Sequence, residues 1–318
     1  MKYLFINSVA GFGSTGRIIL SACERLEQQG HTCRIAYGRQ ATQCGVPTIA
    51  IGSPWDYRFH ALCHRIFGTG GFGSRAATAR FLRQVREYDP DVIWLHNLHG
   101  YYIHVGLLFD YLRSCGKQII WTLHDCWAFT GNCPYFSAVG CEKWKTCCGS
   151  CPQKNVYPKA LLDASRKNYL RKKALFTGIE NLSLEVPSKW LANLVRESFL
   201  KDYPIRVVPN KVDTGVFHPT KSDFRQRMGL EGSFLVLGVA NVWEPRKGLA
   251  DFLALAALLP DSCRIVLVGL PEKQIQKLPA GVLGLPRTPD SRTLSLEVPS
   301  KWLANLVRES FLKDYPIR

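Results

Sequence analysis

Two short polar stretches, residues 96–99 and 124–125, combine side chains that could bind a substrate or move a proton. Each directly follows or ends an apolar run, 91–96 (DVIWLH) or 118–123 (QIIWTL), of the kind that forms a buried parallel strand. In an open α/β sheet, ligands bind beyond the carboxyl ends of the strands. A lone histidine is more often structural, but several polar side chains at neighbouring strand ends predict a site. The candidates are His96, Asn97, His99, His124 and Asp125.

A glycine-rich turn follows the first apolar run, residues 2–9, and opens the first helical pattern. Its sequence, GFGSTG, gives Gly11, Gly13 and Gly16 the G-x-G-x-x-G spacing that lets backbone approach a phosphate at a helix N-terminus. A dinucleotide site also needs an acidic residue about 20 positions later, but the end of the next predicted strand offers Arg39. Arginine suits a 2′-phosphate, so an NADP-dependent oxidoreductase stays open, as does a tight turn without a ligand.

Arg246 and Lys247 lie between a predicted strand, 234–240, and a predicted helix that starts at Gly248. Two cations at a helix N-terminus oppose the helix dipole, which costs about a few tenths of a kcal/mol each. A bound anion would reverse the sign of that effect. We therefore expect a phosphate group at this turn, with a solvated Arg-Lys pair as the alternative.

Six of the twelve cysteines fall in the segment from Cys126 to Cys151. A tetrahedral zinc site could be made from Cys133, Cys141, Cys148 and Cys151. The last two have the C-x-x-C spacing of a zinc knuckle, whereas the first two are too far apart for one, and Cys147 could replace Cys148. A structural zinc ion would explain how a loop over 126–158 stays ordered. Free thiols are the alternative, with a catalytic thiol behind both.

Strand-like apolar runs and helical spacing alternate along the chain. The strand-like runs are 2–9, 31–37, 91–96, 118–123, 181–186, 234–240, 264–270 and 281–286. The helical patterns cover 15–29, 57–68, 74–88, 105–115, 160–176, 188–200 and 248–259. This alternation predicts an α/β fold with doubly wound parallel sheets.

The length of 318 residues suggests two domains. Proline and glycine punctuate residues 203–219, which are typical of a crossover between domains. We therefore expect an N-terminal domain over 1–206, which includes the Cys-rich loop, and a second domain over 207–293. Residues 294–318 repeat 182–206 letter for letter. The second domain is thus shorter than the usual size of about 100–150 residues, and we expect it to be incomplete.

The formal net charge of +16 predicts attraction to anions, whether nucleic acid, anionic lipid or phosphorylated ligands. The densest basic stretch is Arg166, Lys167, Arg171, Lys172 and Lys173. It is either the solvated face of a helix or a contact with a membrane surface. No apolar run reaches the roughly 18–20 residues of a membrane helix, and the first one is too short for a signal peptide. We therefore expect a cytoplasmic protein, with peripheral contact at the inner membrane face left open.

Several motifs together resemble bacterial family-4 glycosyltransferases. They are the strand–GFGSTGR–helix start, LHNLHGYY (95–102), TLHDCWAFTGNC (122–133), PSKWLANLV (187–195), VDTGVFHPT (212–220) and VWEPRKGL (242–249). The resemblance covers roughly residues 1–293. It implies a retaining enzyme of the GT-B fold that builds surface polysaccharides. In that fold two Rossmann-like domains face each other. The C-terminal one holds a nucleotide-diphosphate sugar, and the N-terminal one mainly holds the acceptor, here a saccharide or a lipid-linked saccharide.

The resemblance also implies roles for the candidate residues. His124, with Asp125, would act at the transferred sugar near the reacting carbon, and we assign Asn97 and His99 to the acceptor. The donor-binding set would be Gly11, Gly13, Gly16, Arg246 and Lys247. Catalysis in this fold needs no metal, so zinc would be structural only, and no nucleic-acid partner is expected. A non-catalytic, zinc-stabilised binding module stays open as an alternative.

Three features depart from the family pattern. Asn241 stands where an arginine is common, and Lys211 stands where a glycine is usual. The family's Glu-x7-Glu motif, whose acids contact the donor, has no counterpart. The glutamates after the Arg-Lys pair are Glu272, Glu297 and Glu309, and no two are eight positions apart. We therefore expect the donor-binding half to be cut short at about residue 294, with activity weakened or lost.

Overall fold

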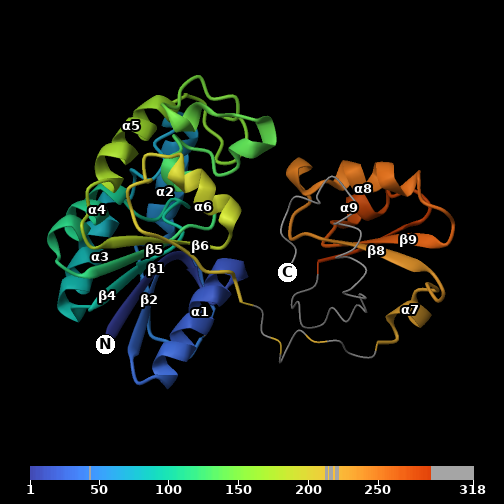
Figure 1. Ribbon diagram of the computed structural model, residues 1–318, viewed down its shortest axis with the longest axis horizontal. Coiled ribbons are helices and arrows are strands. Elements are labelled where there is room, and N and C mark those ends of the chain that lie inside the picture. The colour runs from blue at the N-terminus through green and yellow to red at the C-terminus, as the bar shows by residue number, and fades with distance from the viewer. Residues whose placement is uncertain (43, 212–213, 215–217, 219–221, 288–318) are drawn as a thin grey trace. The chain divides into compact units, whose positions relative to one another are not determined.

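The protein folds as two compact units, Met1–Lys211 and Val212–Arg318 (Figure 1). The computed structural model describes residues 1–42, 44–211, 214, 218 and 222–287. The repeated segment 294–318 therefore lies outside the described residues. Each unit has its own parallel sheet and its own hydrophobic core.

The first unit is built on a seven-stranded sheet in which every neighbouring pair of strands is parallel. The order is β3-β2-β1-β4-β5-β6-β7, so the chain starts near the middle, winds to one edge and then winds to the other. The strands are β1 Lys2–Ala10, β2 Thr32–Ala41, β3 Thr48–Ala50, β4 Val92–Leu95, β5 Gln118–Thr122, β6 Leu182–Val186 and β7 Ile205–Val207. This is the doubly wound arrangement, and it confirms the predicted fold class.

Helices cover both faces of this sheet, because successive side chains of a strand point to opposite faces. Leu4 and Ile6 of β1 enter the larger core, whereas Phe5 between them enters the smaller core beside Ile19 of the first helix. The helices are α1 Gly13–Gln28, α2 Pro54–Phe67, α3 Arg75–Tyr88, α4 Val105–Ser114, α5 Ser165–Phe176 and α6 Lys189–Arg196. The larger core takes its helical side chains from α3, α4, α5 and α6, and Figure 1 shows α1 on the other side of the sheet from α3 and α4.

Local hydrogen bonds from backbone N–H groups to side chains explain why two helices begin away from their predicted starts. α2 begins at Pro54 because the Ser53 side chain accepts the Asp56 N–H and the Asp56 carboxylate accepts the Ser53 N–H. α5 begins at Ser165, whose N–H is bound by the Asp163 carboxylate. The predicted structureless Cys-rich loop contains three short 3-10 helices, η1 Trp127–Phe129, η2 Phe136–Val139 and η3 Lys143–Lys145.

The two edge strands of the sheet, β3 and β7, are not predicted by the sequence pattern. Each is three residues long, too short for a period of two to stand out. β7 pairs with β6 through Val207, so the domain boundary predicted after residue 206 falls inside this strand. β2 also runs past its predicted end, because Gln40 and Ala41 pair with the end of β1 after a register shift.

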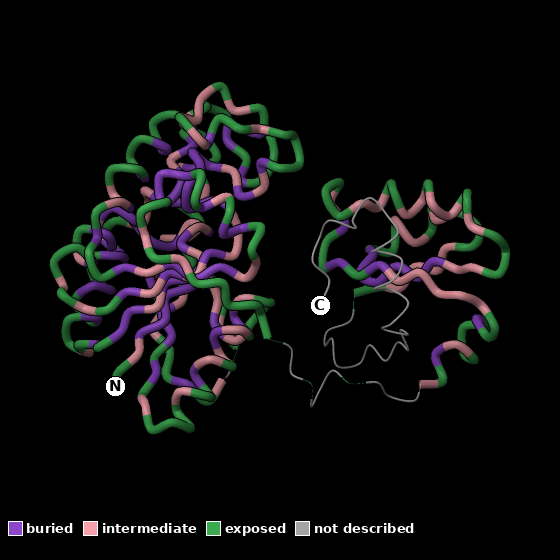
Figure 2. Tube along the Cα trace, viewed as in Figure 1, coloured by how far each residue is buried: buried purple, intermediate pink, exposed green. Residues whose placement is uncertain are grey.

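The described part of the second unit has a three-stranded parallel sheet in the order β10-β9-β8. Its elements are α7 Phe224–Arg227, β8 Phe234–Val239, η4 Pro245–Lys247, α8 Leu249–Ala256, β9 Cys263–Val268, α9 Glu272–Ile275 and β10 Val282–Leu285. Only the central strand is well buried, and both of its neighbours are mostly half-exposed (Figure 2). The predicted strand–helix–strand pattern is confirmed, on a core much smaller than that of the first unit.

Candidate active site

The carboxyl ends of β4 and β5 bring the two predicted histidines together. The strands are adjacent and parallel, with Leu95 opposite Trp121, so the residues that follow them emerge at one edge of the sheet. His96 Nδ1 lies 3.0 Å from His124 Nε2. Their rings stack with centroids 5.3 Å apart and an interplanar angle of 17°. One ring must donate this hydrogen bond and the other accept it, so the pair fixes the orientation of His124.

His96 is the buried member of the pair, and it holds the His124 ring through their hydrogen bond and their stacking. It belongs to a series of stacked rings with Phe5 and Trp94, at centroid distances of 6.0 and 6.1 Å. Its carbonyl accepts a hydrogen bond from the Trp121 indole N–H. Its Nε2 is buried and has no hydrogen-bond partner among the described residues. His96 is therefore a structural residue, and His124 is the ring that a ligand can reach.

Both rings are neutral at physiological pH. Burial lowers the pKa of His96 well below its usual value, and the neighbouring His124 adds to the effect. Burial also lowers the pKa of His124 to about 4, opposed by the Asp125 carboxylate and reinforced by His99. A neutral imidazole can donate a hydrogen bond to a hydroxyl group or accept one from it, and it brings no charge into the site.

Asp125 ties the strand end to the loop that follows it. Its Oδ2 lies 2.8 Å from His99 Nε2, and its Oδ1 accepts the Trp127 N–H at 2.9 Å. Burial alone would raise the pKa of Asp125, but His99 and the Trp127 N–H outweigh it and hold the pKa below its usual value. Both carboxylate oxygens are thus engaged, and the ionised group positions His99.

Asn97 is held through its backbone and keeps its side chain available. Its N–H donates to Asn7 Oδ1 at 3.2 Å, and its carbonyl accepts the Tyr102 hydroxyl at 2.8 Å. The side-chain amide makes no hydrogen bond to any other described residue. Asn7 is fully buried in β1 and was not among the predicted site residues, although a lone amide inside an apolar strand is a usable signal for one.

An aromatic hollow lies beside His99. Its lining includes His99, Tyr101, Trp127 and Tyr157, with His64 and Asn132 beside them. The Tyr101 ring also packs against the inner side of α2, at 5.1 Å from His64. Aromatic faces with hydroxyl tips suit the mixed polar and apolar surface of a sugar. Sequence reasoning missed these tyrosines, because they come together only through the fold.

The glycine turn has the backbone that its sequence predicts. Gly11 and Gly13 have φ angles of +64° and +63°, and a Cβ on Gly11 would stand 2.5 Å from Thr42 Oγ1. α1 starts at Gly13 with no side-chain cap, so its first N–H groups point to a possible anion. Arg39, the residue behind the NADP alternative, lies over the Tyr57 ring at 5.1 Å.

Arg246 and Lys247 belong to the second unit. They form η4 at the end of the loop after β8, and Gly248 starts α8 without a side-chain cap. Arg246 Nε bonds Glu244 Oε2 at 2.8 Å, and both basic residues are exposed. The indole N–H of buried Trp243 donates to the Val268 carbonyl and anchors this loop to the sheet. The predicted donor set is therefore shared between two units, with the glycine turn in the first.

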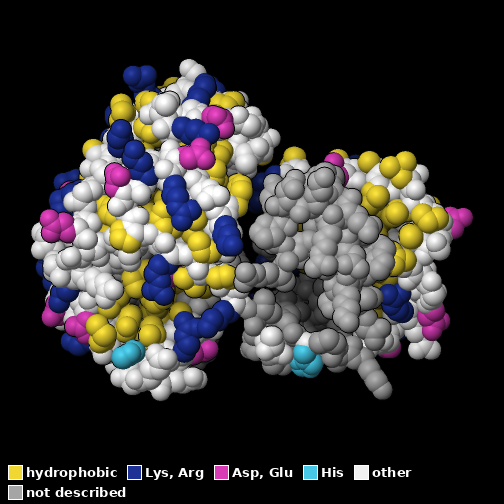
Figure 3. Space-filling model, in the orientation of Figure 1, with side chains coloured by type: hydrophobic (Ala, Val, Ile, Leu, Met, Phe, Trp, Pro, Cys, Tyr) yellow, Lys and Arg dark blue, Asp and Glu magenta, His cyan; other side chains and the backbone are white. Residues whose placement is uncertain are grey.

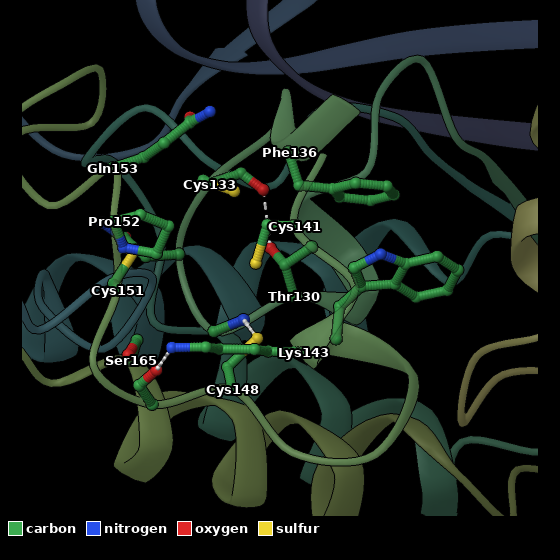
Figure 4. Close-up of a pocket in the computed structure, with 14 residues that line it drawn as sticks. Thr130, Cys133, Phe136, Cys141, Lys143, Cys148, Cys151, Pro152, Gln153 and Ser165 are labelled. Atoms are coloured by element: carbon green, nitrogen blue, oxygen red, sulfur yellow. Dashed lines mark hydrogen bonds between the residues drawn. The ribbon is translucent and has the colours of Figure 1, made fainter. Parts of the chain in front are cut away.

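The four cysteines predicted to bind zinc line one cavity in the first unit (Figure 4). All twelve cysteines are free thiols. Nowhere in the described parts of the chain do three or more Cys, His, Asp or Glu side chains already stand where they could hold one metal ion together. The zinc site thus stays a prediction.

The basic stretch of α5 differs from its prediction at one position. Lys172 is 0 % exposed, whereas Arg166, Lys167, Arg171 and Lys173 are exposed. Elsewhere on the face drawn in Figure 3, Lys and Arg side chains are spread over the first unit with fewer acids between them. Among the described residues, no helix is long and apolar enough to cross a membrane.

Comparison with known proteins places this geometry in a family. The sequence profile of Glycosyltransferase Family 4 matches residues 15–216. WcaC of Escherichia coli (strain K12), provisionally described as a colanic acid biosynthesis glycosyl transferase, is 28% identical over 233 residues, which are 67% of this chain and 55% of that protein. The chain thus spans about half the length of this curated relative.

Solved structures share the fold at low sequence identity. Sucrose-phosphate synthase from Thermosynechococcus elongatus has a TM-score of 0.62 at 13% identity, over 92% of this chain and 72% of that one. Anabaena Alr3699/HepE in complex with UDP gives 0.55 at 14%, over 92% and 71%. WaaG, a glycosyltransferase involved in lipopolysaccharide biosynthesis, gives 0.55 at 15%, over 91% and 71%. These neighbours have the GT-B fold. The profile match, which covers more than half of the chain, shows that the chain belongs to glycosyltransferase family 4.

Proposed function

We propose that the protein transfers a sugar from a nucleotide-diphosphate donor to a saccharide or lipid-linked saccharide in surface polysaccharide synthesis. The observation that carries this proposal is the polar cluster at the ends of β4 and β5, in a chain of this family. The relative WcaC, described for colanic acid biosynthesis, supports the pathway class. HepE structures with UDP and UDP-glucose support the donor class. The oxidoreductase alternative is not favoured.

His124 is the residue we assign to the transferred sugar. It is oriented by His96, is neutral, and stands at the strand end where ligands of such sheets bind. Asp125 acts as a positioning residue, because both of its oxygens are already used to hold His99 and the backbone of Trp127. Asn97, His99 and the aromatic hollow then form the acceptor side.

The donor phosphates would meet the uncapped start of α8, where Lys247 and Arg246 supply positive charge. The α1 turn of the first unit has uncapped N–H groups of its own. In the reaction the bond from the anomeric carbon to the diphosphate breaks, and a bond to the acceptor hydroxyl oxygen forms with loss of its proton. Negative charge grows on the leaving diphosphate, so fixed cations stabilise the transition state more than the ground state.

Calorimetric titration with UDP, GDP and their sugars tests this proposal. We expect one nucleotide to bind the full chain, and Lys247→Ala to weaken that binding. Lys201→Ala, which removes an exposed lysine of the first unit, is the matched control. A folded protein that binds no nucleotide diphosphate would contradict the proposal, as would binding of NADPH in its place.

A membrane-bound acceptor would suit an exposed apolar strip along α2. Trp55 and Phe59 are 74% and 69% exposed. The strip comprises Trp55, Phe59, Leu62, Ile66 and Phe67 of α2 with the adjoining Leu161 and Leu162. The last two are attached to α2 through hydrogen bonds from their N–H groups to the Arg65 and Ile66 carbonyls. Monomeric proteins rarely leave this much apolar surface uncovered without a partner.

Basic residues border the apolar strip, which favours an anionic lipid surface as its partner. Arg58 packs over the Trp55 ring at 5.2 Å, and Arg65 follows two turns later. An amphipathic helix with aromatic residues on one side and arginines beside them is typical of interfacial binding. The inner side of the same helix contacts Tyr101 of the aromatic hollow. We propose that α2 rests on the membrane and brings a lipid-linked acceptor to that hollow.

Vesicle co-sedimentation tests the membrane contact. We expect binding to vesicles that contain phosphatidylglycerol and weaker binding to neutral ones. The double variant Trp55→Ser/Phe59→Ser should lose it, whereas Leu258→Ser, which removes an exposed apolar side chain of the second unit, should not. Equal sedimentation of all three proteins would contradict a role for α2.

A further inference from the structure

The Cys-rich loop encloses a cavity that the proposed reaction does not use. The loop joins β5 to α5 and packs on its own aromatic cluster, in which Phe136 stacks on Trp144 at 4.6 Å. Its cavity of about 20 Å³ is lined by Cys133, Cys141, Cys148 and Cys151. Figure 4 shows these cysteines around the cavity. A space of this size holds one ion or one water.

A backbone N–H group is directed at one of the four sulfurs. Gly131 donates to Cys148 Sγ at 3.2 Å. A hydrogen bond of this kind favours the charged form of its acceptor, so a thiolate at Cys148 has a fixed backbone partner.

Buried polar atoms without partners surround the same cavity. Trp144 Nε1, Ser165 Oγ and Asn132 Oδ1 are buried and make no hydrogen bond to any described residue, and all three residues line the cavity. An unsatisfied buried polar group costs about 1–3 kcal/mol. The indole N–H and the serine hydroxyl would each gain a partner if the neighbouring sulfurs carried negative charge.

The buried Lys172 lies next to this loop. Its Nζ donates to the Trp127 and Thr130 carbonyls at 2.7 and 3.1 Å. Burial lowers the pKa of Lys172 well below its usual value, and Cys148, Asp125 and Cys133 act in the opposite direction. A dianionic metal–thiolate centre nearby would favour the charged form of this side chain.

We propose that Cys133, Cys141, Cys148 and Cys151 bind one Zn²⁺ as a structural centre of the first unit. Four thiols replace their protons with one zinc ion, giving a tetrathiolate of charge −2 and releasing four protons. Since the side chains are not yet within reach of one ion, the sulfurs must close inward on it. Neutral thiols have no attraction that would draw them together beforehand.

The geometry also selects between the neighbouring Cys147 and Cys148. Cys148 lines the cavity, whereas Cys147 does not, and the Cys147 thiol points to the Cys148 carbonyl at 3.4 Å. Cys148 is therefore the ligand, and Cys147→Ser is a matched control at the adjacent position. The zinc centre is independent of the proposed sugar transfer, since it needs neither donor nor acceptor.

Metal analysis of the full chain tests the proposal. After expression with zinc and gel filtration, we expect about one zinc per chain in the wild type and in Cys147→Ser. Cys148→Ser and Cys141→Ser should lose it. Cobalt substitution should give the charge-transfer and visible bands of tetrahedral thiolate ligation. Zinc-free wild type, or zinc retained in both ligand variants, would overturn the proposal, and loss in Cys147→Ser alone would overturn the ligand assignment.

A second measurement needs no variant, in case the ligand variants fail to fold. The wild type is alkylated under native conditions before and after chelation, and the modified cysteines are read by peptide mass spectrometry. We expect the four ligands to be protected until zinc is removed, with Cys147 reacting equally in both samples. The melting temperature should fall on chelation and recover when zinc returns. Identical labelling and melting before and after chelation would overturn the proposal.

Discussion

Acid should unfold the first unit through its buried histidines. His60 and His124 both have a pKa lowered to about 4 by burial, against about 6.5 in an unfolded chain. The unfolded state therefore binds more protons than the folded state between these values. The stability that each neutral histidine gives is present above about pH 6.5 and is lost as the pH falls towards 4.

The size of the effect follows from these pKa values. Each histidine should remove about 2.5 kcal/mol from the free energy of unfolding between about pH 7.5 and about pH 4.5. Together they remove about 5 kcal/mol, a large part of the usual total of about 5–15 kcal/mol. His64, His96 and His104 have pKa values lowered by burial as well, and they act in the same direction.

The charged neighbours of these rings do not cancel the effect. His124 faces Asp125, which opposes the shift, and His99, which adds to it. Around His60, the Gly70 and Tyr101 backbone opposes the shift while His64 and His104 add to it. These influences are already contained in the lowered pKa values, so the slope should be about 2.7 kcal/mol per pH unit near pH 5.5 from the two histidines.

Urea unfolding followed by tryptophan fluorescence measures this slope, because Trp94 and Trp121 lie against the His96–His124 pair. His124→Asn should reduce the slope by about 1.4 kcal/mol per pH unit. His31→Asn, at the amino end of the sheet beside β2, is the matched control and should leave it unchanged. A free energy of unfolding that stays level from neutral pH to about pH 4.5 would refute the reasoning, as would a slope that His124→Asn does not alter.

Four further changes have defined outcomes. His124→Ala should lower kcat by about 10²–10⁴-fold, measured on folded protein as nucleotide released from the donor sugar; full activity would remove it from the site. Lys247→Ala should raise the Kd for the nucleotide diphosphate about 10- to 100-fold, the loss of one charged hydrogen bond, and an unchanged calorimetric titration would rule that contact out. Gly38→Ala should destabilise the first unit by about 1–3 kcal/mol in urea, because its Cβ would overlap the Tyr102 ring. Glu185→Gln should stabilise the first unit at neutral pH and not in acid. Burial raises the pKa of Glu185, so the folded state disfavours the ionised carboxylate that is present at neutral pH; an effect of the substitution that is the same at both pH values would count against this.

The core strands of the first unit were predictable because they are buried on both faces. Such strands are continuous apolar runs. DVIWLH predicts β4 and QIIWTL predicts β5, each to within a residue or two at either end. The edge strands β3 and β7 form because each makes backbone hydrogen bonds to one neighbouring strand. A local sequence pattern does not predict such pairing. The helix starts at Pro54 and Ser165 depend on contacts with the side chains of Ser53 and Asp163, and the sequence contains their Ser-Pro-x-Asp and Asp-x-Ser spacings.

The candidate site was predictable to the extent that it follows strand order. His96 and His124 come together because β4 and β5 are neighbours, as the alternating pattern implies. Asn7 binds the Asn97 N–H across distant segments, and the Tyr101 ring is fixed by contacts with α2. Lys172 was misjudged because a run of basic residues suggests a solvated face. Its spacing of four from Asn168 and Phe176, which are both buried, was the available sign that it lies on the inner side of α5.

The hydrogen bonds from Lys172 to the Cys-rich loop affect which positions of the loop can vary in sequence. The Nζ of Lys172 donates hydrogen bonds to two backbone carbonyl oxygens, which every amino acid provides. Thr130 could therefore be replaced without loss of the hydrogen bond from Lys172 to the carbonyl at this position, whereas replacement of Lys172 would remove both hydrogen bonds. The Cys-rich loop is held through its main chain, so its exposed side chains can vary while the start of the loop stays in place beside Asp125. In the proposed transferase, acceptor specificity could then change through the loop while the candidate site at Asp125 keeps its support.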